Sequence, residues 1–481
     1  MPKYDVVIIG GGVVGTSIFR RLSSNDISVA LLERAPDVCE GASKANSGIV
    51  HTGFDAKPNT LEAKLLQESR ELWPDLIESL HIPYLPCGAI MVATDDQQFE
   101  TLSAKIIPTA RENGVEPVLQ TADEVKQRVP CVNPDILGGL FIEGESLVDP
   151  FWATRAFAEL GVANGGDVYL EAEVVGIDQH PDHLTVRCAG GLVLEAGWLV
   201  NAAGLWADEV ARMVGDESFT LTPRKGQFVL TEDELGLTSI ILPVPTEKSK
   251  GILVTPVVFG GTLLGPTAED QIDKRDRSTT EEGLLRVIAE SAKLVPAAAK
   301  VSSIRQFAGV RAVCSAGDYV IRPSSVCPRL IHAAGIRSTG VSASPGIAAE
   351  VERVLKDLGA LSGTKAVVQT RLPDRFTDEA NNGEVVCLCR SITRHEIELV
   401  LNVPPVPSTL DGIKRRTGAM LGECQGNLCA AAIMDMISKA RNIPVEHVCK
   451  HAAGSHVIVG IAGSTAPVEQ RAQEGGGTEH V

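Results

Sequence analysis

The sequence predicts an α/β protein of two or three domains, and three observations support this class. The apolar segment Val6-Val7-Ile8-Ile9 has the pattern of a short buried strand and is followed at once by three glycines. The chain has 481 residues, whereas one domain usually has about 100–200. Four of its 11 cysteines form a spaced group toward the C-terminus, far from this first segment.

The turn after the first strand is Gly10-Gly11-Gly12-Val13-Val14-Gly15, a G-x-G-x-x-G motif. In such a turn Gly10 permits the tight bend, Gly12 lets the backbone approach a pyrophosphate, and Gly15 lets the following helix pack against the strand. A helical stretch over residues 16–22 and an apolar strand over residues 29–32 come next. The sequence therefore predicts a Rossmann-type unit whose helix N-terminus offers free N–H groups to phosphates.

The second strand ends at Glu33, which is placed to accept hydrogen bonds from ribose hydroxyls. A glycine-rich turn without a ligand is the alternative, and the complete strand–turn–helix–strand–acid arrangement argues against it. The motif alone does not distinguish FAD from NAD, because it occurs in proteins that bind either cofactor. The carboxylate at position 33 disfavours the additional phosphate of NADP.

Two later turns favour FAD. Residues 201–208 (NAAGLWAD) follow an apolar strand and open a helix, and residues 332–340 (HAAGIRSTG) precede a helix expected over about 344–358. A flavin ring is bound largely by backbone N–H groups, and the positive end of the later helix would stabilise the negative charge of reduced flavin. No second complete G-x-G-x-x-G lies in a strand–helix setting, so we expect no separate nicotinamide site.

Residues 3–361 resemble the family of FAD-dependent oxidases and dehydrogenases that includes D-amino-acid oxidase, L-2-hydroxyglutarate oxidase and flavin-dependent glycerol-3-phosphate dehydrogenase. Residues 43–53 (SKANSGIVHTG) look like the family's flavin-flanking loop, and residues 57–65 (KPNTLEAKL) are similar to the segment after that loop in the glycerol-phosphate and hydroxyglutarate branches. The segments that resemble the glycerol-phosphate branch are residues 225–228 (KGQF), 265–270 (GPTAED) and 307–311 (FAGVR).

The resemblance implies a Rossmann-type FAD-binding domain, residues 1–80, 145–215 and 330–365, interwoven with a mostly antiparallel α+β substrate domain, residues 81–144 and 216–329. A strand near residues 171–177 would set the backbone of Val174 against the adenine. The residues expected to bind FAD are Gly10, Gly12, Gly15, Glu33, Arg34, Ser43, Asn46, Ser47, Gly48, Val174, Ala203, Gly204, Trp206, Gly335, Ile336, Arg337, Ser338, Thr339 and Gly340.

The cysteine group has the pattern C-x-C…C-x4-C, formed by Cys387, Cys389, Cys424 and Cys429. Four thiolates are what a [2Fe–2S] cluster takes. The helix expected to start after Cys429 and the N–H groups of the nearby glycines suit an anionic cluster. A structural zinc site is the first alternative, but its usual spacing is C-x2–4-C. Four buried cysteines without any ligand are the second.

Residues 384–462 are also similar to the bacterioferritin-associated-ferredoxin-like [2Fe–2S] domain. Residues 409–417 (TLDGIKRRT) are especially similar to copies of that domain fused to bacterial glycerol-3-phosphate dehydrogenases. The resemblance implies a small helical C-terminal iron–sulfur domain. We expect a linker over residues 366–383 and a flexible tail over residues 463–481.

Oxidation of an alcohol by flavin requires a base for the hydroxyl proton and cations for an anionic substrate. His51, at the end of the flavin loop, is the candidate base. A purely structural role for His51, in a hydrogen bond to the flavin or the backbone, is an equally weighted alternative. Arg311 and Arg337 are candidate anion-binding residues, because guanidinium groups match carboxylate and phosphate oxygens, with packing ion pairs as the alternative. Lys250 is a weaker catalytic candidate.

The composition excludes several partners. A net charge of −17 argues against nucleic acid. No apolar run is long enough to cross a bilayer, and the N-terminus lacks a signal-peptide pattern, so we expect a cytoplasmic protein. The negative net charge does not support peripheral contact with a membrane surface.

Three hypotheses about function remain at this point. The first is a dehydrogenase that transfers hydride from sn-glycerol 3-phosphate to FAD and sends electrons through the [2Fe–2S] cluster to a redox partner protein. The second is oxidation of an anionic 2-hydroxy or amino acid, such as L-2-hydroxyglutarate or hydroxyproline. The third is a non-catalytic electron-transfer subunit.

Overall fold

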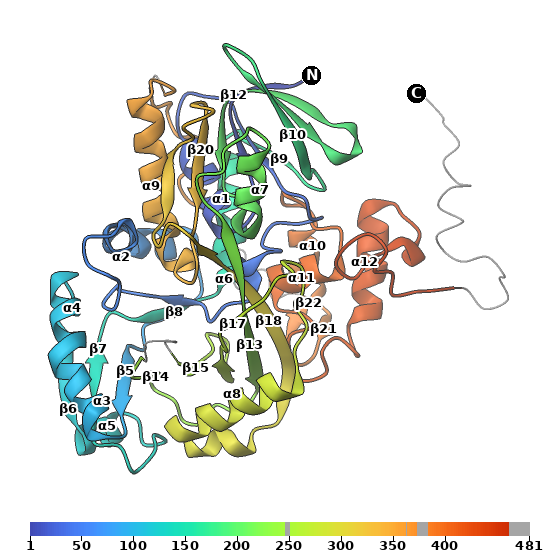
Figure 1. The fold of residues 1–481 in the computed structure, drawn as a ribbon. Helices are drawn as coiled ribbons and strands as arrows, with labels where there is room; N and C mark the ends of the chain where they lie inside the picture. Colours follow the sequence, from blue (N-terminus) through green and yellow to red (C-terminus); the bar gives the residue numbers. More distant parts are fainter. Residues whose placement is uncertain (246–250, 362, 373–382, 461–481) are drawn as a thin grey trace. The chain divides into compact units, whose positions relative to one another are not determined.

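The structure is a computed structural model, and it describes residues 1–245, 251–361, 363–372 and 383–460 (Figure 1). The chain divides into two compact units. The N-terminal unit comprises Met1–Arg34 and Val38–Leu372, and the C-terminal unit comprises Ala35–Asp37 and Pro373–Val481. Lys250, part of the predicted linker and the whole predicted tail lie outside the described residues, and the predicted domain boundaries remain a prediction.

A largely parallel sheet forms one half of the N-terminal unit. Within the described residues it has eight strands, in which β9, β2, β1, β12 and β20 run parallel as neighbours. Val6, Val7 and Ile8 of β1 are fully buried, as expected for a strand covered on both faces. The strands are β1 (Lys3–Ile9), β2 (Val29–Leu32), β9 (Asp167–Tyr169), β10 (Val174–Gln179), β11 (Leu184–Cys188), β12 (Val193–Asn201), β19 (Val320–Pro323) and β20 (Leu330–Ala334).

Helices pack against this sheet and against each other. The helix after the glycine turn, α1, contacts both α6 and α9, and α2 contacts α9. Their apolar faces enclose fully buried side chains such as Ile18, Phe19 and Ile347. The helices of this half are α1 (Val13–Leu22), α2 (Leu61–Ser79), α6 (Pro150–Ala163), α7 (Ala207–Arg212) and α9 (Gly340–Asp357).

The helix expected over 344–358 begins four residues earlier, at Gly340. Pro345 therefore lies inside α9 rather than in its first turn, where proline is best tolerated. Thr339, the residue before the helix, does not cap it with its side chain; its Oγ1 atom donates to Glu62 instead. Because α9 begins at Gly340, the helix N-terminus is formed by the last residues of the predicted flavin turn itself.

The second half of the N-terminal unit contains a mixed sheet with the order β17-β13-β16-β15-β14-β5-β7-β6 and with β18 beside β13. Among the strand pairings of this sheet in the described residues, only that of β14 with β5 is parallel. The prediction of a mostly antiparallel sheet is therefore confirmed. The strands are β5 (Ala89–Ala93), β6 (Val118–Thr121), β7 (Gly138–Ile142), β13 (Leu221–Thr231), β14 (Ile240–Pro243), β15 (Leu253–Pro256), β16 (Thr262–Gly265), β17 (Glu269–Asp270) and β18 (Ser303–Cys314).

Figure 1 shows β13 and β18 running from this sheet toward the parallel-sheet half. The helices beside the mixed sheet are α3 (Asp96–Thr101), α4 (Ile107–Glu112), α5 (Ala122–Arg128) and α8 (Glu281–Leu294). A small antiparallel sheet consists of β3 (Ile49–Val50), β8 (Ser146–Val148) and β4 (Tyr84–Leu85).

The C-terminal unit combines a short hairpin with helices, which confirms the predicted small helical domain. Fully buried isoleucines from different helices, among them Ile397, Ile413 and Ile433, form its core. The elements are β21 (Val385–Cys387), β22 (Ile392–Thr393), α10 (Arg394–Val400), α11 (Leu410–Thr417) and α12 (Ala430–Arg441). Across the described ranges, no helix has the length and apolar character needed to span a membrane.

Candidate functional site

The glycine turn between β1 and α1 has a conformation that larger residues would disrupt. Gly10 has φ +112°, and a Cβ atom built on it would collide with the Ala202 carbonyl group. A Cβ atom on Gly15 would collide with the Gly10 carbonyl oxygen. Gly12 takes the N-cap position of α1 and has no side chain that could cap the helix. The turn therefore keeps the backbone open beside the helix N-terminus, as the binding of a pyrophosphate requires.

Glu33 stands at the end of β2 as predicted. Its side chain is 9% exposed, and its Oε2 atom accepts a hydrogen bond of 2.7 Å from the Gly11 N–H. The Arg34 guanidinium lies 3.5 Å from the centre of the Trp206 ring, a cation–π contact between two predicted cofactor-binding residues. The Ala172 N–H donates to the Glu33 carbonyl oxygen, so the segment that leads into Val174 lies against the end of β2.

The flavin-flanking loop is held in place by its own polar groups. The Val13 N–H donates to Ser43 Oγ over 2.9 Å, which ties the loop to the first turn of α1. Asn46 Oδ1 accepts from the Gly48 N–H over 2.8 Å, and Gly48 has φ +68°. Ser47 lies between them in the same turn. A Cβ atom on Gly309 would collide with the Ala45 carbonyl oxygen, so β18 runs directly against this loop.

The two later turns lie at the same edge of the sheet. Asn201 and His332 pair across β12 and β20 in parallel, so the turns after them emerge side by side. The first contains Ala203, Gly204 and Trp206, and the second runs through Gly335, Ile336, Arg337, Ser338 and Thr339 into Gly340 at the start of α9. Because β1 and β2 end at this edge too, the predicted FAD-binding turns are brought together where open α/β sheets bind their ligands.

This arrangement fits FAD. The glycine cradle suits the pyrophosphate, the buried Glu33 suits the ribose, and the backbone of three turns converges with the α9 N-terminus. In its bound form FAD would be held by these residues.

His51 lies beside the N-terminal turn of α9. Its backbone N–H donates to Ser342 Oγ over 3.0 Å, and Ser342 Oγ donates to the Ile49 carbonyl oxygen over 2.9 Å. Its ring Nδ1 atom is 2.8 Å from Glu145 Oε2, and the Glu145 side chain is 1% exposed. The candidate base is therefore fixed at both its backbone and its ring.

Arg311 lies on β18, two residues beyond the contact with the flavin loop. Its Nη2 atom donates to the Thr267 carbonyl oxygen over 2.6 Å. Burial and the neighbouring Arg224 lower the pKa of Arg311 to about 10, although Asp270 acts in the opposite sense. Within the described residues no carboxylate lies at ion-pair distance from this guanidinium, which stays charged at neutral pH and suits an anion.

Arg337 is placed differently. Its side chain is 46% exposed and forms an ion pair of 3.0 Å with Glu62, which also accepts a hydrogen bond of 2.7 Å from Thr339 Oγ1. Arg337 and Glu62 line a pocket of ≈ 100 Å³ together with Tyr319. Arg337 thus has a carboxylate partner in the protein, and an anionic substrate would compete with Glu62 for it.

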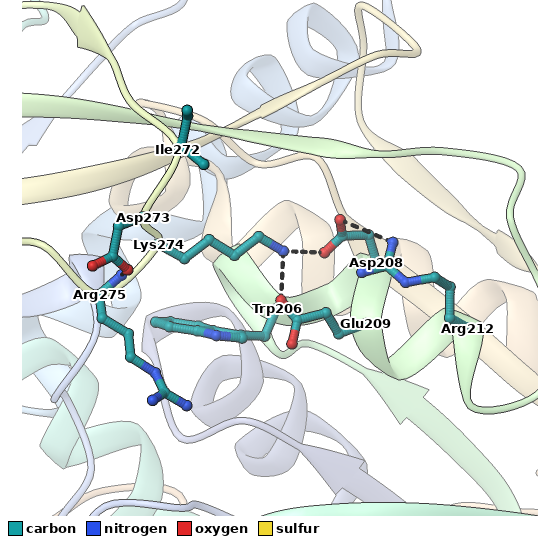
Figure 2. A pocket seen from close by; sticks show the side chains of 8 residues that line it. All are labelled: Trp206, Asp208, Glu209, Arg212, Ile272, Asp273, Lys274 and Arg275. Atoms are coloured by element: carbon teal, nitrogen blue, oxygen red, sulfur yellow. Dashed lines mark hydrogen bonds and ion pairs between the residues drawn. The ribbon is translucent and has the colours of Figure 1, made fainter.

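A second, open pocket of ≈ 480 Å³ lies between α7 and the loop at 272–275 (Figure 2). Lys274 points to Asp208 and Glu209 and forms ion pairs of 2.6 and 2.8 Å with them, and Arg212 pairs with Asp208. The two acidic residues of α7 that line this pocket, Asp208 and Glu209, therefore already have basic partners. Of the predicted catalytic residues that the structure describes, His51, Arg311 and Arg337, none lines this pocket.

The four predicted cluster ligands come together in the C-terminal unit. The thiol of Cys389 lies beside that of Cys424, and the thiol of Cys387 lies beside that of Cys429, which precedes α12. Cys387 and Cys429 are each 1% exposed. Among the residues described, no three His, Cys, Asp or Glu side chains surround a single metal position. A [2Fe–2S] cluster does not need such a group, because each iron takes two of the four thiolates.

The surroundings of these cysteines also fit a cluster. A hydrogen bond from the Leu428 backbone is the main cause that lowers the pKa of the Cys424 thiol, and burial raises the pKa of Cys429 to about 12. A Cβ atom on Gly422 would collide with the Cys389 side chain. Backbone N–H groups and the α12 N-terminus thus face the sulfur atoms, as an anionic cluster requires.

Comparison with known proteins supports both predicted cofactors. Residues 5–353 match the model of the FAD dependent oxidoreductase family, and residues 385–439 match that of the BFD-like [2Fe-2S] binding domain. The chain belongs to the FAD-dependent oxidoreductase family. It is an FAD-dependent oxidoreductase whose second cofactor is a [2Fe–2S] cluster, carried by the C-terminal domain.

Several similar proteins are named for related substrates. A glycerol 3-phosphate dehydrogenase of Caloramator mitchellensis is 33% identical over 474 residues, 95% of this chain and 98% of the relative. A glycerol 3-phosphate oxidase of Mycoplasma genitalium is 32% identical over 74% of this chain and 95% of the relative. The solved structure of dithionite-reduced L-α-glycerophosphate oxidase from Mycoplasma pneumoniae with FAD bound superimposes with a TM-score of 0.73, at 29% identity, over 78% of this chain and 100% of that chain.

The residues that hold the candidate catalytic groups were not predicted from the sequence. Glu62, Glu145 and Ser342 lie far along the chain from Arg337 and His51. Each stands in an ordinary helix or turn sequence. The only local signal is that Glu145 lies between two apolar strands, where a charged residue needs a partner.

Proposed function

We propose that this enzyme oxidises sn-glycerol 3-phosphate to dihydroxyacetone phosphate. The observation that carries the proposal is the similarity to the Caloramator glycerol 3-phosphate dehydrogenase, which extends over both units of the chain. The half-buried guanidinium of Arg311 supports it, because a phosphate is best bound by a cation that has no competing carboxylate.

In this proposal His51 takes the proton of the substrate hydroxyl, and Arg311 holds the phosphate. Arg337 would bind the same anionic end only by giving up its ion pair with Glu62. Lys250 remains a sequence-based candidate. When bound, FAD supplies the acceptor for the hydride that leaves the substrate carbon. The residues of the chain position the carbon, exclude water and remove the proton.

We further propose that electrons leave one at a time through the [2Fe–2S] cluster to a redox partner protein. A second, one-electron cofactor in the same chain supports this route, because an oxidase that passes electron pairs to oxygen does not need it. A cytoplasmic location remains part of the same proposal.

The substrate test is anaerobic addition of glycerol 3-phosphate to the purified enzyme. We expect the visible absorption band of oxidised flavin to disappear. An unchanged spectrum would reject this substrate. An unchanged spectrum with every small substrate tested would instead favour a role in electron transfer alone.

The second candidate is an anionic 2-hydroxy or amino acid such as L-2-hydroxyglutarate or hydroxyproline. It is favoured by a specific similarity: an L-2-hydroxyglutarate dehydrogenase of Escherichia coli is 29% identical over 70% of this chain and 83% of the relative. Arg311 would then bind a carboxylate. The same anaerobic assay with a panel of hydroxy and amino acids distinguishes the two candidates by the rate of flavin reduction.

A further inference from the structure

Glu145 is a buried acid in the turn between β7 and β8, and its environment is unusual for a carboxylate. Its side chain is 1% exposed. Oε1 accepts hydrogen bonds from the Thr52 N–H over 2.6 Å and from Thr52 Oγ1 over 2.8 Å, and Oε2 contacts His51 Nδ1 over 2.8 Å. In the described part of the chain, His51 is its only ion-pair partner. Within the described ranges no lysine or arginine pairs with this carboxylate, so a proton taken up by the His51 ring would meet an opposite charge beside Nδ1.

The register of a small sheet places these two residues opposite each other. β3 and β8 are antiparallel, with Ile49 opposite Leu147 and Val50 opposite Ser146. The next pair along the same register is His51 and Glu145. The Gly88 N–H donates to the Glu145 carbonyl oxygen over 2.9 Å, which holds the acid from the other side. The contact is therefore built into the backbone pairing rather than left to a mobile surface side chain.

The hydrogen bond also selects the form of the imidazole ring. A carboxylate accepts but does not donate, so neutral His51 carries its proton on Nδ1 and has Nε2 as the acceptor nitrogen. The backbone N–H of His51 is held by Ser342 in the first turn of α9, while the ring is held by Glu145. Cys87 also interacts electrostatically with Glu145, but burial raises the pKa of its thiol to about 11, so it stays neutral near pH 7.

We propose that Glu145 is the positioning residue of a His51–Glu145 pair, which sets the tautomer of the base and stabilises the imidazolium formed during alcohol oxidation. This inference rests on the proposed function. The proton balance is simple: the substrate O–H bond breaks, the proton ends on Nε2, and Nδ1 keeps its own proton toward Glu145. The acid stays ionised throughout.

The test compares Glu145→Gln with Glu143→Gln in the FAD-loaded enzyme. Glu143 is an exposed acid two residues away, so the same chemical change serves as a matched control. With glycerol 3-phosphate, we expect Glu145→Gln to reduce flavin about 10²–10⁴-fold more slowly, because the amide supports the wrong tautomer. The acidic limb of the rate profile should move to lower pH by about one unit or more. Glu143→Gln should match the wild type.

A second measurement does not depend on turnover. The ¹⁵N shifts of the His51 ring in the wild-type holoenzyme, assigned by comparison with His51→Gln, should report a proton on Nδ1. A proton on Nε2 in the neutral ring would overturn the proposal. So would a Glu145→Gln enzyme with the rate and pH profile of Glu143→Gln. If the wild type fails to respond to glycerol 3-phosphate, the proposed substrate fails, while the ring measurement still decides the role of Glu145.

Discussion

At the scale of single residues, the two candidate anion-binding arginines of the N-terminal unit differ in the partner that each has within the protein. Arg337 has its carboxylate partner, Glu62, inside the protein. Arg311 instead donates to a backbone carbonyl oxygen, and burial is the main cause that lowers its pKa to about 10. A half-buried cation with a neutral partner gains more from an anionic ligand than one already paired with a carboxylate, so Arg311 is the better candidate for substrate binding.

We therefore expect Arg311→Gln to raise the KM for glycerol 3-phosphate about 10–150-fold, with a smaller effect on kcat. This range corresponds to the loss of about 1.5–3 kcal/mol for a hydrogen bond to a charged group. Steady-state kinetics measure it, and Arg305→Gln on the same strand is the control. A KM for Arg311→Gln equal to that of the control would show that Arg311 does not bind the substrate.

At the scale of elements, the conformation of the β1–α1 turn decides whether FAD binds. We expect Gly10→Ala to be purified with little or no flavin, because the added Cβ atom meets the Ala202 carbonyl group. Gly359→Ala is a matched control: Gly359 also has a positive φ, +73°, but an added Cβ atom there has open space. The ratio of flavin to protein measures both, and full flavin content in Gly10→Ala would contradict the assigned turn.

The start of α6 offers a second prediction at this scale. Asp149 caps the helix by accepting from the Phe151 and Trp152 N–H groups, while burial raises the pKa of its carboxyl to about 6. Since the folded-state pKa lies above the ordinary value near 3.9, the folded state takes up the proton first. The cost of the buried charge is thus fully present above pH 6 and disappears as the pH falls toward 4.

Asparagine caps a helix as well as aspartate does and carries no charge. Asp149→Asn should therefore raise the stability of the holoenzyme by up to about 2–3 kcal/mol at pH 8, and the gain should shrink at pH 5. Melting temperatures of the variant and the wild type at both pH values measure the difference. An equal difference at the two pH values would contradict the assigned cause.

At the scale of the whole molecule, two cofactor sites share one chain, and their tasks can be separated. In Cys424→Ser, one of the two cysteine pairs is broken. We expect iron content to fall strongly, while flavin content and anaerobic reduction of the flavin by glycerol 3-phosphate persist. Turnover with a one-electron acceptor should fall, because the proposed exit for electrons is lost.

Cys449→Ser is the control for this experiment. Cys449 lies in the same unit, and its thiol donates to the His447 carbonyl oxygen over 3.8 Å. Iron analysis, flavin absorbance and acceptor reduction separate the two variants. If Cys424→Ser turns over with the one-electron acceptor as fast as the control does, electrons do not need the cluster, and the proposed route is wrong.

Much of this protein could be predicted from the sequence because the relevant physics is local. The turn at Gly10, Gly12 and Gly15 depends on φ angles and close approaches within a few residues, and the acid at Glu33 is placed by the length of one strand–helix–strand unit. The ligand group from Cys387 to Cys429 is visible for the same reason, since the spacing of the ligands is itself the signal.

Other features appeared only in the tertiary structure. The pairs His51–Glu145 and Arg337–Glu62 join residues 94 and 275 positions apart, and the early start of α9 at Gly340 depends on its surroundings rather than on Pro345. No local pattern specifies which distant acid a histidine or an arginine will meet, because that choice is made by strand register and packing. The sequence thus determined which cofactors the chain binds, whereas the fold decided how the candidate base and the two candidate cations are held: backbone conformation is encoded locally, and the pairing of buried charges is not.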